Sequence, residues 1–308
     1  MKRINEKVKD LIEVRNFKSL QDFFKDPTET LSAYQFTETT ADMMAKWLDR
    51  VSDVQPDTGH SLALAGYRGV GKSHFLAAFG AILTQPELRS RIADNHVSVS
   101  TQRLKRRRYP VTFVKRGTCD SLLDELRESI ARTFEIPVAS LSSELSEVLA
   151  DSAERAGELP FVLIIDTALE RSARVARNDG ETLGAIAQHA SKLNMFVGVA
   201  LDDDIAGADG ANLAISRSFA IDYLDQEHLY RIVDTHVFPK SRHTQPLIHD
   251  IYEYFREVLP HFRWSEQRFS ALYPLHPMIL EVAPYIRFYA PAFALLGFAS
   301  EAGARVLG

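Results

Sequence analysis

The stretch that decides the fold of this sequence is Gly66-Tyr67-Arg68-Gly69-Val70-Gly71-Lys72-Ser73. It matches the pattern G-x-x-x-x-G-K-[ST], which is typical of a phosphate-binding loop (P-loop) between a strand and a helix. Glycines let backbone N–H groups turn towards phosphate oxygens, where side chains would block their approach. The following helix adds the positive end of its dipole. The pattern therefore predicts a nucleotide site; the alternative is a chance glycine-rich turn.

Two side chains of the motif have specific expected roles. Lys72 is expected to place its charge on the β- and γ-phosphates, and the Ser73 hydroxyl is expected to bind magnesium. The guanine-reading pattern N-K-x-D is absent from the sequence, so the expected cofactors are ATP and Mg²⁺. The full set of expected nucleotide contacts is Gly66, Tyr67, Arg68, Gly69, Val70, Gly71, Lys72, Ser73 and His74.

Strands and helices alternate on both sides of this loop. Ser61–Ala65 is a short apolar strand, and Lys72–Thr84 has apolar residues at helical spacing. Further strands are expected at Val111–Val114, Phe161–Ile165, Met195–Leu201 and Ser218–Ile221, and helices between them at Cys119–Thr133, Leu141–Ala156 and Glu181–Leu193. Alternation with short connections predicts a parallel sheet with right-handed crossovers.

The regions outside this core read as helical. One helix is expected over Thr28–Val51, and strand signals stop after Leu224. The last quarter predicts helices at Glu227–Val237, Pro246–Val258, Pro277–Tyr289 and Ala292–Leu307. The expected organisation is an N-terminal helical segment (1–55), a P-loop α/β core (56–225) and an all-helical lid domain (226–308). Because the last helix runs almost to residue 308, the chain is expected to be a piece of a longer protein.

Asp166 is the candidate for the second nucleotide motif. It ends the wholly apolar strand Phe161–Ile165, as the magnesium-holding aspartate of a Walker B strand does. The alternative is an aspartate that caps the next turn. A complete strand, Val111–Val114, lies between the two motifs in the chain. This favours the additional-strand class of P-loop NTPases, which includes AAA+ proteins, over GTPases and nucleotide kinases.

The usual water-activating carboxylate is missing after Asp166. That class carries a glutamate at the next position, where this chain has Thr167, and a threonine cannot take a proton from water at neutral pH. Glu170 could substitute if the intervening segment turns helical. The run 202–204 (Asp202, Asp203 and Asp204) follows the next strand, where a phosphate sensor is usual; the alternative is a solvated acidic loop. We therefore expect binding without efficient hydrolysis.

Three cationic features are further candidates. Arg217 precedes the last core strand, where an arginine can reach the phosphate of a neighbouring subunit; the alternative is a surface salt bridge. The run Arg103–Arg108 could contact DNA or RNA phosphates, although such runs are commonly solvated helix faces. Arg287 is the candidate phosphate-sensing arginine of the lid, and the alternative is a side chain that extends from the helix into solvent.

Composition sets the broad class of the protein. The 308 residues are 45% hydrophobic and 25% charged, as in ordinary globular proteins, and the net charge of −5 gives no global case for nucleic-acid binding. The single cysteine, Cys119, excludes an intrachain disulfide. The N-terminus has no signal-peptide core, and no apolar run could cross a bilayer as a helix. We expect a cytoplasmic protein without membrane contact.

The sequence resembles a known family in three places. They are Gly66–Phe75 (GYRGVGKSHF), Tyr34-Gln35-Phe36-Thr37, and the segment from Tyr273 to Pro277 (YPLHP). Together they are similar to the N-terminal ATPase region of large bacterial BrxC/PglY-like proteins of BREX and phage-growth-limitation systems. The resemblance implies an AAA+ core with a helical lid, a homo-oligomer, defence-system partners and a role on DNA. That family typically has aspartate–glutamate where this chain has Asp166-Thr167.

These observations leave alternative functions. The first is an ATP-driven switch or motor module of an antiphage defence complex, with slow intrinsic hydrolysis. The second is a nucleotide-binding scaffold with little or no hydrolysis that organises such a complex. A small-molecule kinase is a weaker third reading, since the sequence has no acceptor-site signature.

Overall fold

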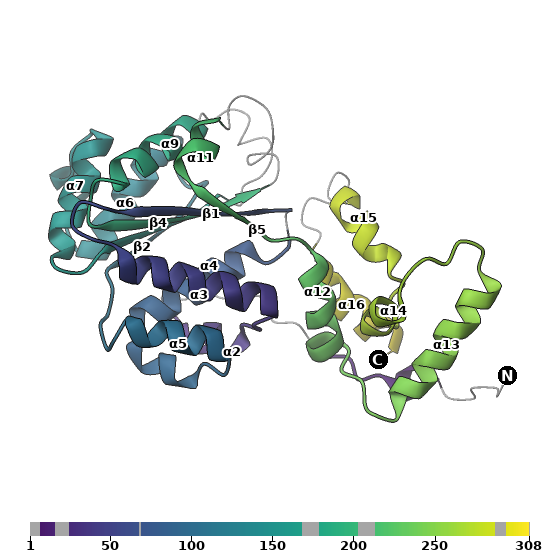
Figure 1. The fold of residues 1–308 in the computed structure, drawn as a ribbon. Coiled ribbons are helices and arrows are strands. Elements are labelled where there is room, and N and C mark those ends of the chain that lie inside the picture. Colours follow the sequence, from purple (N-terminus) through teal and green to yellow (C-terminus); the bar gives the residue numbers. More distant parts are fainter. Residues whose placement is uncertain are drawn as a thin grey trace. The chain divides into compact units, whose positions relative to one another are not determined.

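The computed structural model describes residues 7–15, 25–67, 69–167, 179–202, 213–286 and 294–307. Contacts divide the chain into two compact units (Figure 1). We call them the sheet unit (Leu20–Tyr67 with Gly71–Leu224) and the helical unit (Met1–Ser19, Arg68–Val70 and Asp225–Gly308). The units differ from the expected segments at the N-terminus, because the described residues 7–15 cluster with the C-terminal helices.

Five strands form the centre of the sheet unit. They are β1 (His60–Gly66), β2 (Val111–Lys115), β3 (Phe161–Asp166), β4 (Met195–Asp202) and β5 (Ala220–Tyr223), and they lie in the order β2-β3-β4-β1-β5. All four pairings are parallel. β3 is buried along its whole length, as its apolar sequence predicts for a strand with covered faces. The expected parallel α/β class is therefore confirmed.

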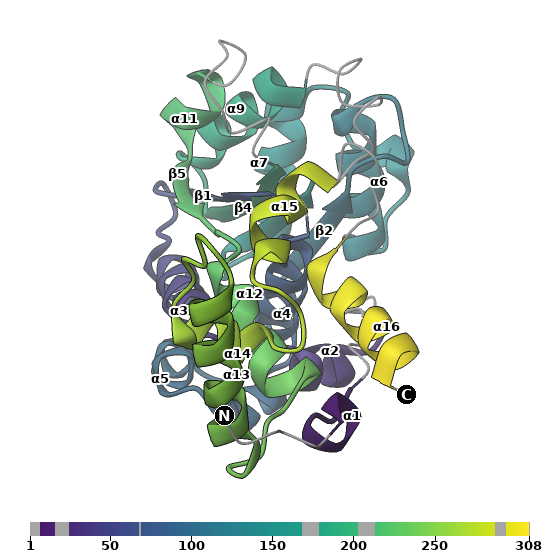
Figure 2. The same cartoon turned by 90° about the vertical axis from the view of Figure 1, so that its right-hand side faces the viewer.

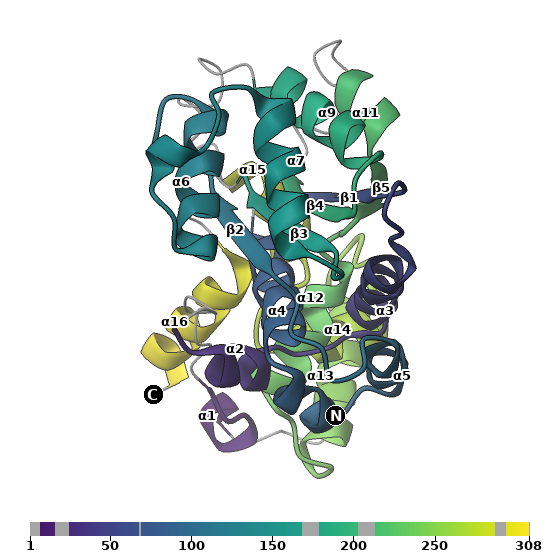
Figure 3. The same ribbon diagram turned by 90° about the vertical axis from the view of Figure 1, so that its left-hand side faces the viewer.

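Helices cover both faces of this sheet (Figures 1, 2 and 3). On one face lie α2 (Pro27–Ala33), α3 (Glu38–Asp53), α4 (Lys72–Thr84) and α5 (Asn95–Arg103). On the other lie α6 (Leu122–Phe134), α7 (Leu145–Ala156), α9 (Asp179–Ala190) and α11 (Leu213–Ser218). Because alternate side chains of a strand point to opposite faces, the central strands β1, β3 and β4 contribute buried side chains to both cores.

An aromatic cluster fills the core beneath α3 and α4. The Trp47 ring lies edge-on to Phe75 and Phe79, at centroid distances of 5.2 and 5.4 Å, and also contacts Phe196. A Cβ atom on Gly198 would lie 2.7 Å from this indole. Glycine is therefore required on β4 at this point, because the indole fills the space above it.

One sequence expectation about the first helices was wrong. The helix expected over Thr28–Val51 is two helices, α2 and α3, with Tyr34 in extended backbone after α2. The break follows from capping at Thr37. Its hydroxyl accepts from the backbone N–H of Thr40, whose hydroxyl in turn accepts from the N–H of Thr37. This reciprocal pair starts a new helix instead of continuing the old one. The helices α5 and α11 and the 3₁₀ helix η1 (Pro86–Arg91) were not anticipated.

The helical unit contains more helices than the sequence suggested. It comprises α1 (Val8–Leu11), α12 (Glu227–Ile232) continuing into a π-helical turn (Val233–Val237), α13 (Thr244–Val258), α14 (Glu266–Leu272), α15 (Met278–Ile286) and α16 (Leu295–Leu307). The N-terminal segment belongs here because the Thr244 hydroxyl donates to the Leu11 carbonyl and the Arg15 N–H donates to the Val237 carbonyl. Among the described residues, no helix is long and apolar enough to cross a membrane.

Candidate nucleotide-binding site

The loop between β1 and α4 has backbone angles that glycine permits. Gly69 has φ 85° and Gly71 has φ 102°, both in the left-handed region that side chains disfavour. Gly71 is the residue before the first turn of α4, so the helix N-terminus opens directly onto the loop. Arg68 lies outside the described residues. The geometry is that of a loop whose backbone N–H groups and helix dipole converge on an anion.

Lys72 is held inside this loop. Its side chain is 5% exposed, and its Nζ atom donates to the carbonyls of Gly66 at 2.7 Å and Tyr67 at 2.8 Å. These carbonyls fix the ammonium at the carboxyl end of β1, where the loop begins. A buried cation fixed in this way supplies the point charge that phosphate binding needs.

The next two residues differ in their exposure. Ser73 is exposed in the first turn of α4, whereas His74 is half-buried. Burial lowers the pKa of His74, which favours the neutral imidazole at neutral pH. The hydroxyl of Ser73 is thus available to a cation, and His74 contributes no positive charge to the loop.

The carboxyl ends of three strands bring the second motif to the same edge. Asp166 pairs in register with Ala200 of β4, and Gly66 of β1 pairs with Asp202 of β4. Two strand spacings of about 4.8 Å therefore separate β3 from β1. Asp166 is 5% exposed. The predicted pair of motifs is thus placed on one edge of the sheet, with the single strand β4 between them.

The strand between the two motifs is not the one that chain order suggested. β4 lies between β1 and β3 in the sheet, while β2 lies on the far side of β3. The additional strand that separates the P-loop strand from the Asp166 strand is therefore β4. The order of strands in the chain does not determine which strands are neighbours in the sheet, because the connection between two parallel strands can pass over another strand.

Thr167 has a structural contact that the sequence did not reveal. Its side chain is 2% exposed, and its hydroxyl donates to the Ala200 carbonyl at 2.7 Å. The single hydroxyl proton thus fastens the end of β3 to β4. Position 167 therefore holds neither a carboxylate nor an exposed hydroxyl with which to activate water.

The remaining candidate residues are Glu170, the acidic run 202–204, Arg217 and Arg287. Glu170, Asp203, Asp204 and Arg287 lie outside the described residues, as does the side chain of Asp202. Arg217 is exposed at the end of α11, so it is accessible to another molecule. Its role as a trans-acting arginine stays a prediction.

A buried ionic network next to Asp166 was missed. The backbone N–H of Arg116, directly after β2, donates to the Asp166 carbonyl at 2.9 Å. The Arg116 side chain is fully buried and binds Asp179 through two hydrogen bonds of 2.8 and 3.1 Å. It also lies 3.0 Å from Glu125. In the sequence, Arg116 and Gly117 show only a charged residue and a glycine at the end of a strand. This pattern does not identify Asp179, 63 residues away, as the partner of Arg116.

Glu125 closes the turn after β2. Its Oε1 atom accepts from the backbone N–H groups of Gly117, Thr118 and Cys119 at 2.7, 2.5 and 2.7 Å. Burial by itself raises the pKa of Glu125, but the backbone donors and Arg116 outweigh it, and the pKa lies below its usual range. The carboxylate is therefore ionised and shapes the edge of the sheet beside Asp166.

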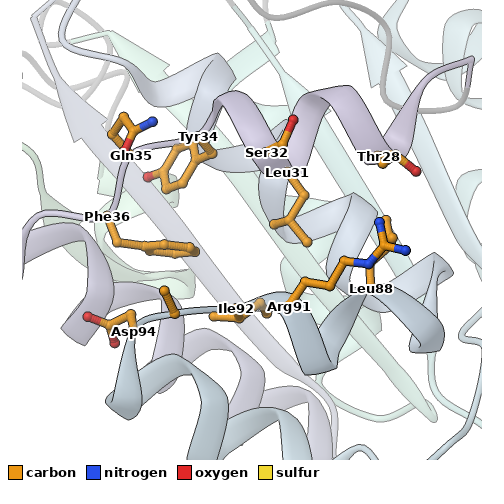
Figure 4. A pocket seen from close by; sticks show the side chains of 11 residues that line it. Thr28, Leu31, Ser32, Tyr34, Gln35, Phe36, Leu88, Arg91, Ile92 and Asp94 are labelled. Atoms are coloured by element: carbon orange, nitrogen blue, oxygen red, sulfur yellow. The ribbon is translucent and has the colours of Figure 1, made fainter. Parts of the chain in front are cut away.

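A separate cavity lies on the α2 side of the sheet unit. Its volume is about 430 Å³, and Figure 4 shows residues of α2, η1 and the 34–36 segment around it. Tyr34 and Phe36 line it with ring centroids 4.9 Å apart, and Arg91 and Asp94 lie on the opposite side. None of its lining residues belongs to the P-loop.

Comparison with known proteins finds similar solved structures at low sequence identity. No family model and no curated protein matches the sequence. Among solved structures, the Walker-type ATPase PABY2304 of Pyrococcus abyssi is 18% identical, with a TM-score of 0.36 over 89% of this chain and 73% of that one. Cdc6p from Pyrobaculum aerophilum is 14% identical, with a TM-score of 0.38 over 86% and 67%. AMPPCP-bound DnaA from Aquifex aeolicus is 12% identical, with a TM-score of 0.35 over 92% and 70%.

The sheet and the loop themselves define the class. A five-stranded parallel sheet in the order β2-β3-β4-β1-β5 carries a P-loop after β1, with one strand between it and the Asp166 strand. Helices follow the core in the chain. The chain has the fold of a P-loop NTPase of the additional-strand, AAA+-like type.

Proposed function

We propose that this chain is the ATP-binding module of an AAA+-type ATPase, acting as a switch or motor with slow intrinsic hydrolysis. The observation that carries the proposal is the position of the Lys72 ammonium. The carbonyls of Gly66 and Tyr67 hold it at the N-terminus of α4, directly after the glycine-rich loop. In this position it would contact the β- and γ-phosphates.

Magnesium fits the oxygen donors of this edge. Mg²⁺ prefers hard oxygen ligands and usually binds through one or two protein groups together with phosphates. Ser73 offers an exposed hydroxyl, and Asp166 offers a carboxylate on the same edge. The described residues contain no group of three or more histidine, cysteine or acidic side chains that could hold a metal by themselves. The donor set therefore supports a metal that arrives with the nucleotide.

Slow hydrolysis is proposed because of Thr167. Its hydroxyl is committed to the Ala200 carbonyl, and the usual base is absent there. General-base assistance is typically worth roughly 100- to 10,000-fold in rate. The same observation favours the second candidate function, a nucleotide-binding scaffold with little or no turnover. Glu170 remains the proposed substitute base in the first candidate.

The proposed biological setting rests on the resemblance to BrxC/PglY-like proteins. We propose a role in cytoplasmic antiphage defence, in a homo-oligomer that meets other defence-system proteins and DNA. Arg217 is the proposed arginine that reaches the neighbouring subunit's nucleotide, and its exposure supports this. The run Arg103–Arg108 is the proposed DNA contact.

Titration calorimetry with ATP and Mg²⁺ tests the binding proposal. The wild-type chain is expected to bind, and Lys72→Ala is expected to lose at least tenfold in affinity. Equal affinity of the two proteins would contradict the P-loop assignment. Steady-state phosphate release, with and without DNA, separates the two functions: stimulated turnover supports the switch or motor, whereas tight binding without turnover supports the scaffold.

A further inference from the structure

A buried arginine organises the turn that contains the basic run. Arg89, in η1, is 6% exposed and donates four hydrogen bonds to backbone carbonyls. Two go to the end of α4, to Ile82 at 2.8 Å and Leu83 at 3.1 Å. The other two go to Lys105 at 2.6 Å and Arg107 at 2.8 Å. One guanidinium thus ties the residues after α5 to the end of α4.

This clamp fixes the direction of the side chains in the segment 104–109, which we call the basic turn. Its carbonyls at 105 and 107 face Arg89, and Lys105 adopts a φ of 53° in the left-handed region. The flanking Leu104 and Tyr109 are 0% and 5% exposed. Lys105, Arg106, Arg107 and Arg108 are all exposed. The backbone is therefore ordered from inside, and the cationic side chains extend outward.

The cations of the run are not equivalent. Arg103 is neutralised by Asp49 at 3.0 Å and Asp53 at 2.5 Å. Arg108 donates through Nε to the Thr84 carbonyl at 2.8 Å.

The other three cations of the basic turn differ from Arg103 and Arg108. Within the described chain, no carboxylate pairs with Lys105, Arg106 or Arg107. Three adjacent and uncompensated positive charges therefore stand on one ordered turn, in a chain whose net charge is −5.

We propose that Lys105, Arg106 and Arg107 form a contact surface for the phosphate backbone of duplex DNA. This deepens the proposed function and rests on DNA being its partner. Both apolar side chains of the turn are buried, so the surface lacks the exposed anchor that protein interfaces centre on. It also lacks an exposed aromatic ring on which single-stranded bases would stack. Phosphate contact needs only positioned cations.

The position of the turn separates this surface from the nucleotide. The basic turn leads into the amino end of β2, and the Tyr109 N–H donates to the Leu83 carbonyl at the end of α4. The P-loop lies at the opposite end of α4, where that helix begins. Removal of the three charges is therefore expected to leave ATP affinity unchanged.

Fluorescence anisotropy with a labelled random-sequence duplex tests the proposal across a salt series. Each neutralised phosphate contributes about −0.9 to the slope of log K against log salt, so three contacts give about −2.7. The wild-type affinity is then expected to fall about 40-fold between 50 and 200 mM salt from this surface alone. The triple variant Lys105→Gln/Arg106→Gln/Arg107→Gln is expected to bind at least tenfold more weakly at 50 mM, with the slope reduced by about 2.7.

A second triple variant controls for net charge. Arg132→Gln/Arg155→Gln/Lys192→Gln removes three exposed cations elsewhere on the sheet unit and is expected to bind the duplex as the wild type does. Equal weakening by both sets would overturn the proposal, as would an unchanged salt slope in the first. A polyglutamate peptide that binds the basic turn as tightly as the duplex would also overturn it, in favour of an acidic protein partner. If the wild type binds ATP but not the duplex, the DNA proposal fails and the nucleotide function stands. If Lys72→Ala loses ATP binding but still binds the duplex, the nucleotide function and the DNA contact are independent of each other.

Discussion

Replacement of Glu125 by glutamine tests the ionic network beside Asp166. The substitution keeps the shape of the side chain and removes its charge. Oε1 of the wild type accepts from three backbone N–H groups and lies 3.0 Å from the Arg116 guanidinium. Hydrogen bonds to charged groups are worth about 1.5–3 kcal/mol each, and breaking a buried pair costs about 3–5 kcal/mol. Because Asp179 still balances Arg116 in the variant, we expect a loss of about 3 kcal/mol in the free energy of unfolding.

The stability that Glu125 contributes is expected to decrease at low pH. The folded-state pKa of Glu125 lies below its unfolded value. Its contribution is therefore fully present above the unfolded pKa, near 4.3, and is lost as the pH falls through the folded pKa. The difference in stability between the wild type and Glu125→Gln should be constant from pH 7 to about pH 5 and should shrink below about pH 4.

Urea unfolding, followed by far-UV circular dichroism at several pH values, measures this difference. Glu128→Gln is the matched control, since Glu128 is exposed one turn further along α6, and it should change stability by less than about 0.5 kcal/mol. A Glu125→Gln protein as stable as this control at pH 7 would refute the reasoning. So would a difference that grows as the pH falls.

Three further predictions concern single positions. Thr167→Val removes the hydroxyl that bonds the Ala200 carbonyl, so the free energy of unfolding should fall by about 1–3 kcal/mol while phosphate release is not slowed. A loss of turnover in this variant would show instead that the hydroxyl acts on water. Thr167→Glu should raise turnover by about 100-fold or more while ATP affinity in calorimetry stays within threefold, and a slower variant would place the base elsewhere. Gly59→Ala should cost about 3 kcal/mol or more in urea unfolding, because its Cβ would lie 2.1 Å from the Ala190 carbonyl oxygen and 2.5 Å from that of Met195; a well-tolerated alanine would mean that this backbone can shift.

The sequence by itself determined the class of fold and the position of its P-loop. Glycine spacing and the strand-to-helix context act over a few residues, so the helix Lys72–Thr84 was predicted with the bounds that α4 has. The apolar run before Asp166 likewise identified β3, because burial on both faces excludes polar residues from a strand.

Only the tertiary structure decided which partner each polar group has. Thr167 bonds a carbonyl 33 residues away, and Arg116 binds an aspartate 63 residues away. The strand order, with β4 between β1 and β3, was likewise decided only by the tertiary structure. In the basic run, Arg103 lies against Asp49 and Asp53, whereas Lys105, Arg106 and Arg107 have no carboxylate partner among the described residues, although the sequence shows only a row of cations. Local patterns record backbone preference and burial, whereas the partner of a charge depends on which distant segments the fold brings within about 3 Å of it.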